Sequence, residues 1–374
     1  MRRETTPTPS ALGYSFPPEF GPQCATWFSW PRPEGISFPG RYHTITQDLA
    51  GIIRETALRQ DVHINVMNEN WHRLVLSQLA AAGVPIPLLK GATRRVFFHY
   101  IRTNECWCRD HGPAFVLNGR STAIVDWKFN AWGAKYPPWN DDDAVPTRIA
   151  ERARIRVFDA PLVMEGGSVE FNGAGTILTT SQCLLHKNRN PGVSRARIER
   201  ALLDYYGQRH TVWLSEGIQG DDTDGHIDDL ARFLSQDTVV IAVEEDKKDP
   251  NYRETTRALT KLQKARDQDG RPFRIVTVPM PARVEYEGQR CPATFMNFLF
   301  VNGAVLVPRF GNDGRWRECR RTLEKALPNH EVVPVDSRQL IWGLGSVHCL
   351  SQQVPEAPGL RERLRRAAEK PVKF

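Results

Sequence analysis

The 374-residue chain is predicted to adopt an α/β fold, because strand-like and helix-like segments alternate along its whole length. The strand-like segments are short and rich in β-branched and aromatic residues, and the helix-like segments are longer, with apolar residues at helical spacing. No linker-like stretch divides them. We therefore expect a single domain over residues 11–374, preceded by a disordered start at residues 1–10 that is rich in Thr and Pro.

The predicted strands, in chain order, are residues 62–67, 95–100, 121–129, 175–180, 238–243, 273–278, 298–307 and 331–335. The predicted helices are residues 42–59, 71–82, 194–206, 251–268 and 315–326. Pro250 and Pro328 are suitable boundary residues before and after helices. Polar clusters near positions 110, 165, 226, 297 and 349 recur at intervals of about 50 to 70 residues. This spacing suits about five αβ units, each of which delivers one loop to a shared centre.

The composition indicates a soluble globular protein, with 40% hydrophobic and 25% charged residues. No apolar run approaches the ~20 residues that span a bilayer, and the N-terminus does not resemble a secretory signal. Seven cysteines without regular spacing argue for a reducing compartment, so we expect a cytoplasmic protein. The net charge of +7 comes from scattered basic residues and a few basic runs. We interpret these as solvated helix surface, with a short basic helix at residues 360–370, and expect no nucleic-acid or membrane partner.

Cys349 is the candidate nucleophile. A free cysteine is by default a small buried hydrophobic residue. Here, however, Gly343 and Gly345 precede it, and the polar residues Ser351 and Gln352 follow. Glycine allows the sharp turn or close backbone approach that a nucleophile in a loop requires.

His226 is the candidate acid/base, in a segment that contains Asp222 and Asp228. An extended backbone would direct the side chains of His226 and Asp228 to the same face. Any single aspartate here is equally well explained by a turn or a helix N-terminus. A calcium loop is excluded, because the glycine and the terminal glutamate of that motif are absent from the required positions.

Three further residues complete the candidate site. Trp107 could stack on a flat cation, and Asp110 could accept two N–H bonds from a guanidinium group. The alternative for Asp110 is a structural ion pair near Arg109. Glu165, before two glycines, is a candidate loop acid. Cys106 and Cys108 have the wrong spacing for a zinc site, and we interpret them as structural. Together, a thiol, an imidazole and several carboxylates predict covalent cysteine catalysis on a guanidinium group.

These motifs resemble those of the agmatine deiminase family, in the guanidine-modifying superfamily that also contains arginine and peptidylarginine deiminases. The matching blocks are Trp107-Cys-Arg-Asp-His-Gly-Pro113, Phe129-Asn-Ala-Trp-Gly133, Glu165-Gly-Gly-Ser168, Asn188-Arg-Asn-Pro191, Asp222-Thr-Asp-Gly-His-Ile-Asp228, Asn302-Gly-Ala-Val-Leu-Val-Pro308 and His348-Cys-Leu-Ser-Gln-Gln353. The resemblance implies a five-bladed pseudo-symmetric α/β propeller of the pentein type, with repeated ββαβ units around a central active site.

The resemblance also implies the reaction and the roles. Agmatine and water would give N-carbamoylputrescine and ammonia through a covalent thiouronium intermediate, without a metal or an organic cofactor. The only partner implied is a small cationic guanidinium substrate, with homo-oligomer formation left open. The implied roles are nucleophile for Cys349, general acid/base for His226 with Glu165 beside it, guanidinium anchors for Asp110 and Asp228, and contacts to the rest of the substrate for Trp107 and Asp222.

Three departures from the family pattern concern the substrate. The chain has Gly343-Leu-Gly-Ser-Val-His-Cys349 where the family commonly has Gly-Gly-Gly-Asn-Ile-His-Cys, and Asp229 where Asn is usual. Lys135, near the expected entrance, would suit a substrate carboxylate better than an amine. An arginine or peptidylarginine deiminase is therefore the near alternative. A non-catalytic propeller that binds a partner and a cysteine protease are more distant ones.

Overall fold

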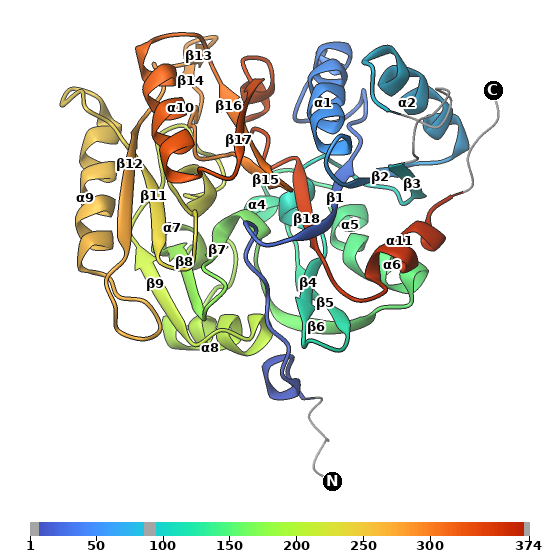
Figure 1. Cartoon of the computed structure of the whole chain (residues 1–374), viewed down its shortest axis with the longest axis horizontal. Helices are drawn as coiled ribbons and strands as arrows, with labels where there is room; N and C mark the ends of the chain where they lie inside the picture. The colour runs from blue at the N-terminus through green and yellow to red at the C-terminus, as the bar shows by residue number, and fades with distance from the viewer. Residues whose placement is uncertain (1–6, 86–94, 370–374) are drawn as a thin grey trace.

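The computed structural model describes residues 7–85 and 95–369. Within these residues the strands form five sheets of three or four strands and one separate hairpin. Figure 1 shows the long helices at the outside of the molecule and the sheets nearer its middle. The predicted α/β class is confirmed. In the described part of the chain, none of the helices has the length and apolar character needed to cross a membrane.

The strand orders and bounds are as follows. The first sheet is β18 (Ser351–Pro355), β1 (Gln23–Ser29), β2 (Asp61–Val66) and β3 (Val96–Tyr100). The second is β4 (Ala114–Leu117), β5 (Thr122–Lys128) and β6 (Arg156–Val163), and the third is β7 (Val169–Phe171), β8 (Thr176–Thr180) and β9 (His210–Leu214). The fourth is β10 (Ala231–Phe233), β11 (Thr238–Val243) and β12 (Arg274–Pro279), and the fifth is β15 (Leu299–Val301), β16 (Ala304–Arg309) and β17 (Glu331–Asp336). The hairpin is β13 (Glu285–Tyr286) and β14 (Gln289–Arg290).

All five sheets repeat one pairing pattern, an antiparallel pair next to a parallel pair. Parallel neighbours need a crossover connection. A helix lies in each crossover: α1 (Tyr42–Ala57), α6 (Val145–Ala153), α8 (Arg195–Tyr206), α9 (Pro250–Lys264) and α10 (Gly314–Ala326). In the first sheet, α2 (Glu69–Ala81) leads to the additional strand β3. Because β18 pairs with β1, the last strand of the chain lies beside the first.

Most predicted elements are confirmed. Seven of the predicted strands correspond to β2, β3, β5, β8, β11, β12 and β17, and the predicted helices correspond to α1, α2, α8, α9 and α10. Helix α9 begins at Pro250 as expected, with Asp249 as its N-cap, but it ends at Lys264 rather than at residue 268. The basic tail forms α11 (Leu360–Ala367). Residues 1–6 of the predicted disordered start lie outside the described residues, and Ser10–Leu12 form the 3-10 helix η1.

The prediction of one strand over residues 298–307 is wrong. This segment is a hairpin, with β15 and β16 antiparallel and joined through Asn302 and Gly303. Gly303 has a φ of 75°, in the left-handed region that glycine adopts without strain. Apolar residues on both sides of this turn made the two short strands look like one long strand.

Short helices bring the polar motifs together. They are α3 (Cys108–His111), α4 (Ala131–Ala134), α5 (Asn140–Asp143), α7 (Ser181–Leu184), η2 (Gly166–Ser168), η3 (Ile227–Asp229) and η4 (Leu340–Gly343). Helix α3 contacts both η2 and β18, and η2 contacts η3. Segments that are far apart in the sequence therefore meet in one place.

Candidate active site

Cys349 lies between η4 and β18, and 6% of its surface is exposed. The chain reaches it past Gly343 and Gly345, which pack against the rings of Phe38 and Trp107. A Cβ atom at Gly345 would lie 2.5 Å from the Trp107 ring. Any residue other than glycine would therefore displace the loop that carries the thiol.

Asn297 holds this loop, although no role was predicted for it. Its Nδ2 lies 3.0 Å from the Cys349 Sγ. Its Oδ1 accepts from the backbone N–H groups of His348 at 3.0 Å and Cys349 at 3.3 Å. Asn297 is a fully buried polar residue between Met296 and Phe298, and this interruption of an apolar run is the sequence signal that could have identified it.

Nearby carboxylates influence the protonation state of the Cys349 thiol. The Asp228 Oδ2 lies 3.9 Å from the Cys349 Sγ. Burial, followed by the negative charges of Asp228, Asp229 and Asp110, raises the pKa of Cys349 well above its usual range. The free protein therefore holds a neutral thiol at neutral pH. A cation bound next to these carboxylates would favour the thiolate.

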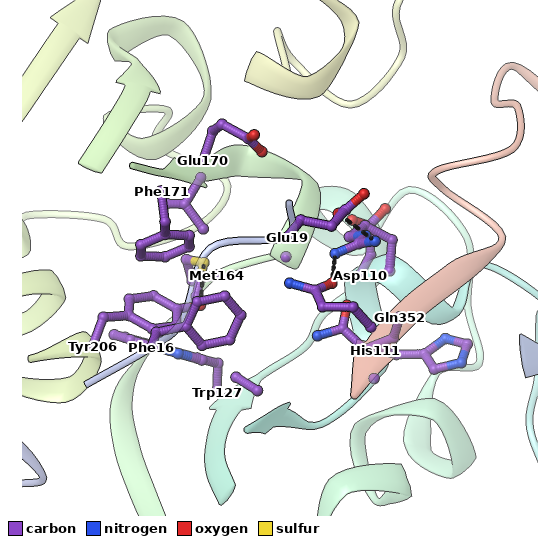
Figure 2. Close-up of a pocket in the computed structure, with 16 residues that line it drawn as sticks. Phe16, Glu19, Asp110, His111, Trp127, Met164, Glu170, Phe171, Tyr206 and Gln352 are labelled. Atoms are coloured by element: carbon purple, nitrogen blue, oxygen red, sulfur yellow. Dashed lines mark hydrogen bonds and ion pairs between the residues drawn. The ribbon is translucent and has the colours of Figure 1, made fainter. Parts of the chain in front are cut away.

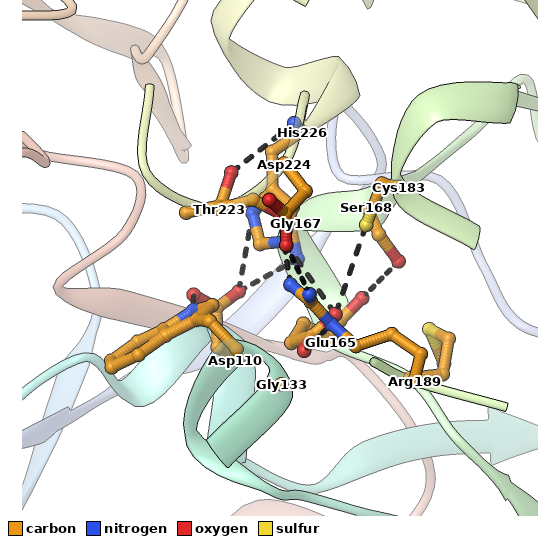
Figure 3. A network of polar contacts seen from close by, with 12 residues as sticks. Asp110, Gly133, Glu165, Gly167, Ser168, Cys183, Arg189, Thr223, Asp224 and His226 are labelled. Carbon is orange, nitrogen blue, oxygen red and sulfur yellow. Dashed lines mark hydrogen bonds and ion pairs between the residues drawn. The ribbon is translucent and has the colours of Figure 1, made fainter. Parts of the chain in front are cut away.

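His226 is fully buried, and Asp110 and Glu165 lie beside it (Figure 3). Its Nε2 lies 3.6 Å from the Glu165 Oε2, and its Nδ1 lies 3.8 Å from the Asp110 Oδ1 and 4.0 Å from the Asp228 Oδ1. Burial alone lowers the pKa of His226, but Asp110, Cys183 and Glu165 outweigh it and raise the pKa well above its usual range. The imidazole is therefore protonated at neutral pH and can donate a proton.

Glu165 is paired with a buried arginine that the sequence analysis missed. The Arg189 Nε lies 2.7 Å from the Glu165 Oε1, and both side chains are fully buried. Arg189 also donates to the carbonyl of Thr223 at 2.8 Å and to the carboxylate of Asp224. Burial raises the pKa of Glu165, but Arg189 and then His226 outweigh it and lower the pKa. Glu165 is therefore ionised beside His226 (Figure 3).

Asp110 is fixed from two sides. Its Oδ2 accepts from the Trp132 Nε1 at 2.9 Å, and its Oδ1 accepts from the backbone N–H of Gly167 at 3.0 Å. A Cβ atom at Gly167 would lie 2.6 Å from the His226 Nδ1, so the approach of η2 to the site requires glycine. The predicted alternative for Asp110 is not observed, because Arg109 bonds to Glu19 at 3.0 Å instead.

Trp132 reaches Asp110 from a strained turn, α4. Ala131, Trp132, Gly133 and Ala134 have φ values of 50°, 55°, 91° and 63°. Such values are costly for residues with a Cβ atom, and strain of this kind concentrates at functional sites. The side chain of Asn130 accepts from the backbone N–H of Gly133 at 2.8 Å and stabilises the turn.

An open cavity of about 240 Å³ adjoins Cys349. Its aromatic lining consists of Trp107, Trp132, Tyr136 and Trp342. Its charged lining, among the described residues, consists of Glu105, Asp110 and Asp222. The Trp107 Nε1 donates to the Ser37 Oγ at 2.7 Å, which fixes the indole in the cavity wall.

The expectation that Lys135 suits a substrate carboxylate is wrong. The Lys135 Nζ lies 3.4 Å from the Asp222 Oδ1 and 3.0 Å from the Asp224 Oδ1, so its charge is already balanced. Tyr136 donates its hydroxyl to Asp222 as well. Lys135 therefore orients Asp222 and does not line the cavity.

A second, interior cavity of about 30 Å³ lies behind Asp110 (Figure 2). Aromatic rings that include Phe16, Phe171 and Tyr206 form one side of it, and polar side chains that include Glu19 form the other. Asp110 lines both cavities. This cavity is large enough for one or two water molecules, which the polar side could bind.

One group of side chains has the spacing of metal ligands in the described part of the chain, Glu165, Cys183 and His226. The Arg189 guanidinium already occupies a Glu165 oxygen, and the raised pKa of His226 keeps its nitrogens protonated. We therefore assign these three side chains to the polar network around His226.

Comparison with known proteins identifies the family of this chain. The sequence model of the Porphyromonas-type peptidyl-arginine deiminase family matches residues 15–355. The chain belongs to this family. As a member of it, the protein is an enzyme, a hydrolase that acts on a guanidino carbon–nitrogen bond.

Individual relatives cover nearly the whole chain. The agmatine deiminase of Pseudomonas syringae pv. tomato is 34% identical over 373 residues, with 93% of this chain and 97% of that protein covered. The agmatine deiminase of Enterococcus faecalis superposes with a TM-score of 0.85 at 29% identity, and covers 95% of this chain and 100% of its own. The agmatine deiminase of C. jejuni with substrate bound gives a TM-score of 0.82 at 30% identity, with 92% of this chain and 97% of that chain covered. The predicted resemblance is confirmed.

Proposed function

We propose that the protein deiminates agmatine, with water as the second substrate and N-carbamoylputrescine and ammonia as products. The observation that carries this proposal is the charge of the open cavity: its described charged lining residues, Glu105, Asp110 and Asp222, are all acidic. Agmatine is cationic at both ends, so an acidic cavity suits it. Arginine would bring its carboxylate among like charges, which costs several kcal/mol. The relatives named above carry the same activity in their names.

In the proposed complex the guanidinium group lies between Asp110 and Asp228, next to the Cys349 thiol. Trp107 packs along the alkyl chain, and Asp222 receives the distal ammonium. The two carboxylates keep the group cationic and hold its carbon in line with the sulfur. The cation offsets their negative charge, so the Cys349 thiol releases its proton to water and becomes the thiolate.

The proposed reaction then has two stages. The thiolate forms a bond to the guanidinium carbon, and His226 gives its proton to one amino nitrogen, so that ammonia leaves and a thiouronium adduct remains. Water gives a proton to the now neutral His226 as its oxygen bonds to the same carbon. The carbon–sulfur bond breaks, the new hydroxyl loses its proton to water, and the ureido product leaves. Glu165 stabilises the protonated form of His226 throughout.

The finer architecture is also a proposal. We infer that the five sheets are the blades of a pseudo-symmetric propeller of ββαβ units, with residues 11–374 as one catalytic domain and Cys349 at its centre. The repeated strand pairing supports this arrangement. The contacts among α3, η2, η3 and β18 support a shared centre. We propose that the enzyme acts in the cytoplasm.

Turnover of three substrates tests the function. The purified protein is incubated with agmatine, free arginine and an arginine-containing peptide, and ammonia and ureido product are measured. We expect agmatine to exceed arginine in kcat/KM by at least about 100-fold, because of like-charge repulsion in the cavity. Cys349→Ser, which keeps the volume of the site, is the control for background hydrolysis. Turnover of the peptide without turnover of agmatine would contradict the proposal.

A further inference from the structure

His348, next to Cys349 in the chain, connects two buried carboxylates. Its Nδ1 lies 2.7 Å from the Asp228 Oδ2, and its Nε2 lies 2.7 Å from the Glu19 Oε2. All three side chains are almost completely buried. Both ring nitrogens are thus engaged at the length of charge-assisted hydrogen bonds.

Glu19, the carboxylate on the Nε2 side of His348, is held as an anion. The Glu19 Oε2 lies 3.0 Å from the Arg109 Nη2, and its Oε1 lies 3.1 Å from the Arg232 Nη2. Burial raises the pKa of Glu19, but His348, Arg232 and Arg109 outweigh it and lower the pKa well below its usual range. An ionised carboxylate only accepts hydrogen bonds, so the Nε2 of His348 carries a proton.

Asp228, the carboxylate on the Nδ1 side of His348, is an anion for a related reason. Burial raises the pKa of Asp228, but the hydrogen bond and charge of His348, followed by the charge of His226, outweigh it and lower the pKa. The His348 ring therefore bridges two ionised carboxylates, with a 2.7 Å contact on each of its nitrogens. The other titratable or charged groups near this ring and its two partners are Arg109 and Asp110 on α3, Asp229 on η3, Arg232 on β10 and Glu170 on β7.

We propose that His348 is a positioning residue, which bridges Glu19 and Asp228 and holds the Asp228 carboxylate in one orientation to receive the guanidinium group of the substrate. The proposal rests on the proposed function. His348 does not exchange protons with the substrate, because both of its nitrogens are bonded to carboxylates. His226 differs, since its nitrogens lie 3.6 Å or more from the nearest carboxylate oxygens.

His348→Gln is the decisive variant, because it removes the imidazole bridge between Glu19 and Asp228 and retains a side chain that hydrogen-bonds. We expect kcat/KM for agmatine to fall at least about 10-fold, as for loss of a hydrogen bond to a charged group. The acid limb of its pH profile should move to higher pH, because Asp228 then binds a proton more readily. An unshifted acid limb, with or without lower activity, would overturn the proposal, since a merely structural role would not move it.

A probe that needs no turnover separates this inference from the proposed function. Alkylation of Cys349 by 2-chloroacetamidine, an amidinium electrophile, is compared with alkylation by neutral iodoacetamide. We expect His348→Gln to reduce the preference for the amidinium reagent. A wild-type protein that prefers the amidinium reagent but does not turn over agmatine would refute the proposed function alone. Equal preference in wild type and variant would refute the positioning role.

Two more variants complete the design. His43→Gln changes an exposed histidine on α1 and should leave the profile and the reagent preference unchanged. Glu19→Gln removes the far anion without touching Asp228, and should move the acid limb in the same direction by a smaller amount. If His348→Gln does not fold, Glu19→Gln provides the test. An unshifted acid limb in the pH profile of this folded variant would overturn the proposal.

Discussion

Arg189 and Glu165 form a buried ion pair beside His226, and removal of the cation should be costly. The Arg189 Nε and the Glu165 Oε1 are 2.7 Å apart, and both side chains are fully buried. Arg189→Met leaves Glu165 buried without its main counter-charge, while Asp224 keeps Lys135 at 3.0 Å. Breaking a buried pair from one side costs about 3–5 kcal/mol. We expect the free energy of unfolding to fall by that amount.

Denaturant unfolding of a double-mutant cycle measures this cost. Glu165→Gln added to Arg189→Met removes the stranded anion and should restore at least about 1.5 kcal/mol, because a neutral amide is less costly to bury. Arg200→Met is a matched control: the Arg200 Nε also lies 2.7 Å from a carboxylate, that of Asp204, but its side chain is 76% exposed. Exposed pairs contribute about 0–1 kcal/mol. The reasoning is refuted if Arg189→Met costs no more than Arg200→Met.

Three further predictions concern the groups around His226. Trp132→Phe removes the hydrogen bond to Asp110. The kcat/KM for agmatine should fall about 10-fold or more, while the thermal midpoint of unfolding changes little. A kcat/KM equal to that of the wild type would show that the bond is dispensable. Gly167→Ala places a Cβ atom 2.6 Å from the His226 Nδ1, so the variant should lose about 1–3 kcal/mol of stability, measured by denaturant unfolding, together with most of its turnover. The raised pKa of His226 contributes stability that is fully present below the unfolded pKa of about 6.5 and is lost as the pH rises through the folded value. The stability difference between wild type and His226→Asn should therefore be larger at pH 6 than at pH 10, and the opposite order would refute the charge assignment.

The sequence identified the residues whose type is unusual for their surroundings. Cys349 among glycines, His226 among aspartates and Glu165 before two glycines are local patterns. The structure places His226 beside Glu165, Asp110 and Asp228, and Cys349 beside Asp228. The alternation of strands and helices was likewise sufficient for the α/β class. Each of these patterns is formed by residues that lie within a few positions of one another along the chain.

The missed features depend on contacts across the fold. Glu19 bonds to Arg109, Arg232 and His348, which come from three other parts of the chain, and no local pattern reveals such partners. Strand β1 was missed because all of its residues are buried, so polar and apolar residues do not alternate along it. Strands β7 and β10 have only three residues each, which is too short for any periodicity.

The distribution of charge explains how the same site could bind its substrate and release its product. Arg109, Arg189, Arg232 and His348 pair with carboxylates on the interior side of the site. On the side of the open cavity, the described charged lining is acidic. In the proposed complex a guanidinium group adds positive charge beside Asp110 and Asp228, whereas the neutral ureido group formed by deimination does not. Loss of this charge weakens the contact with both carboxylates and raises the pKa of the Cys349 thiol again, so the chemical step itself favours release of the product.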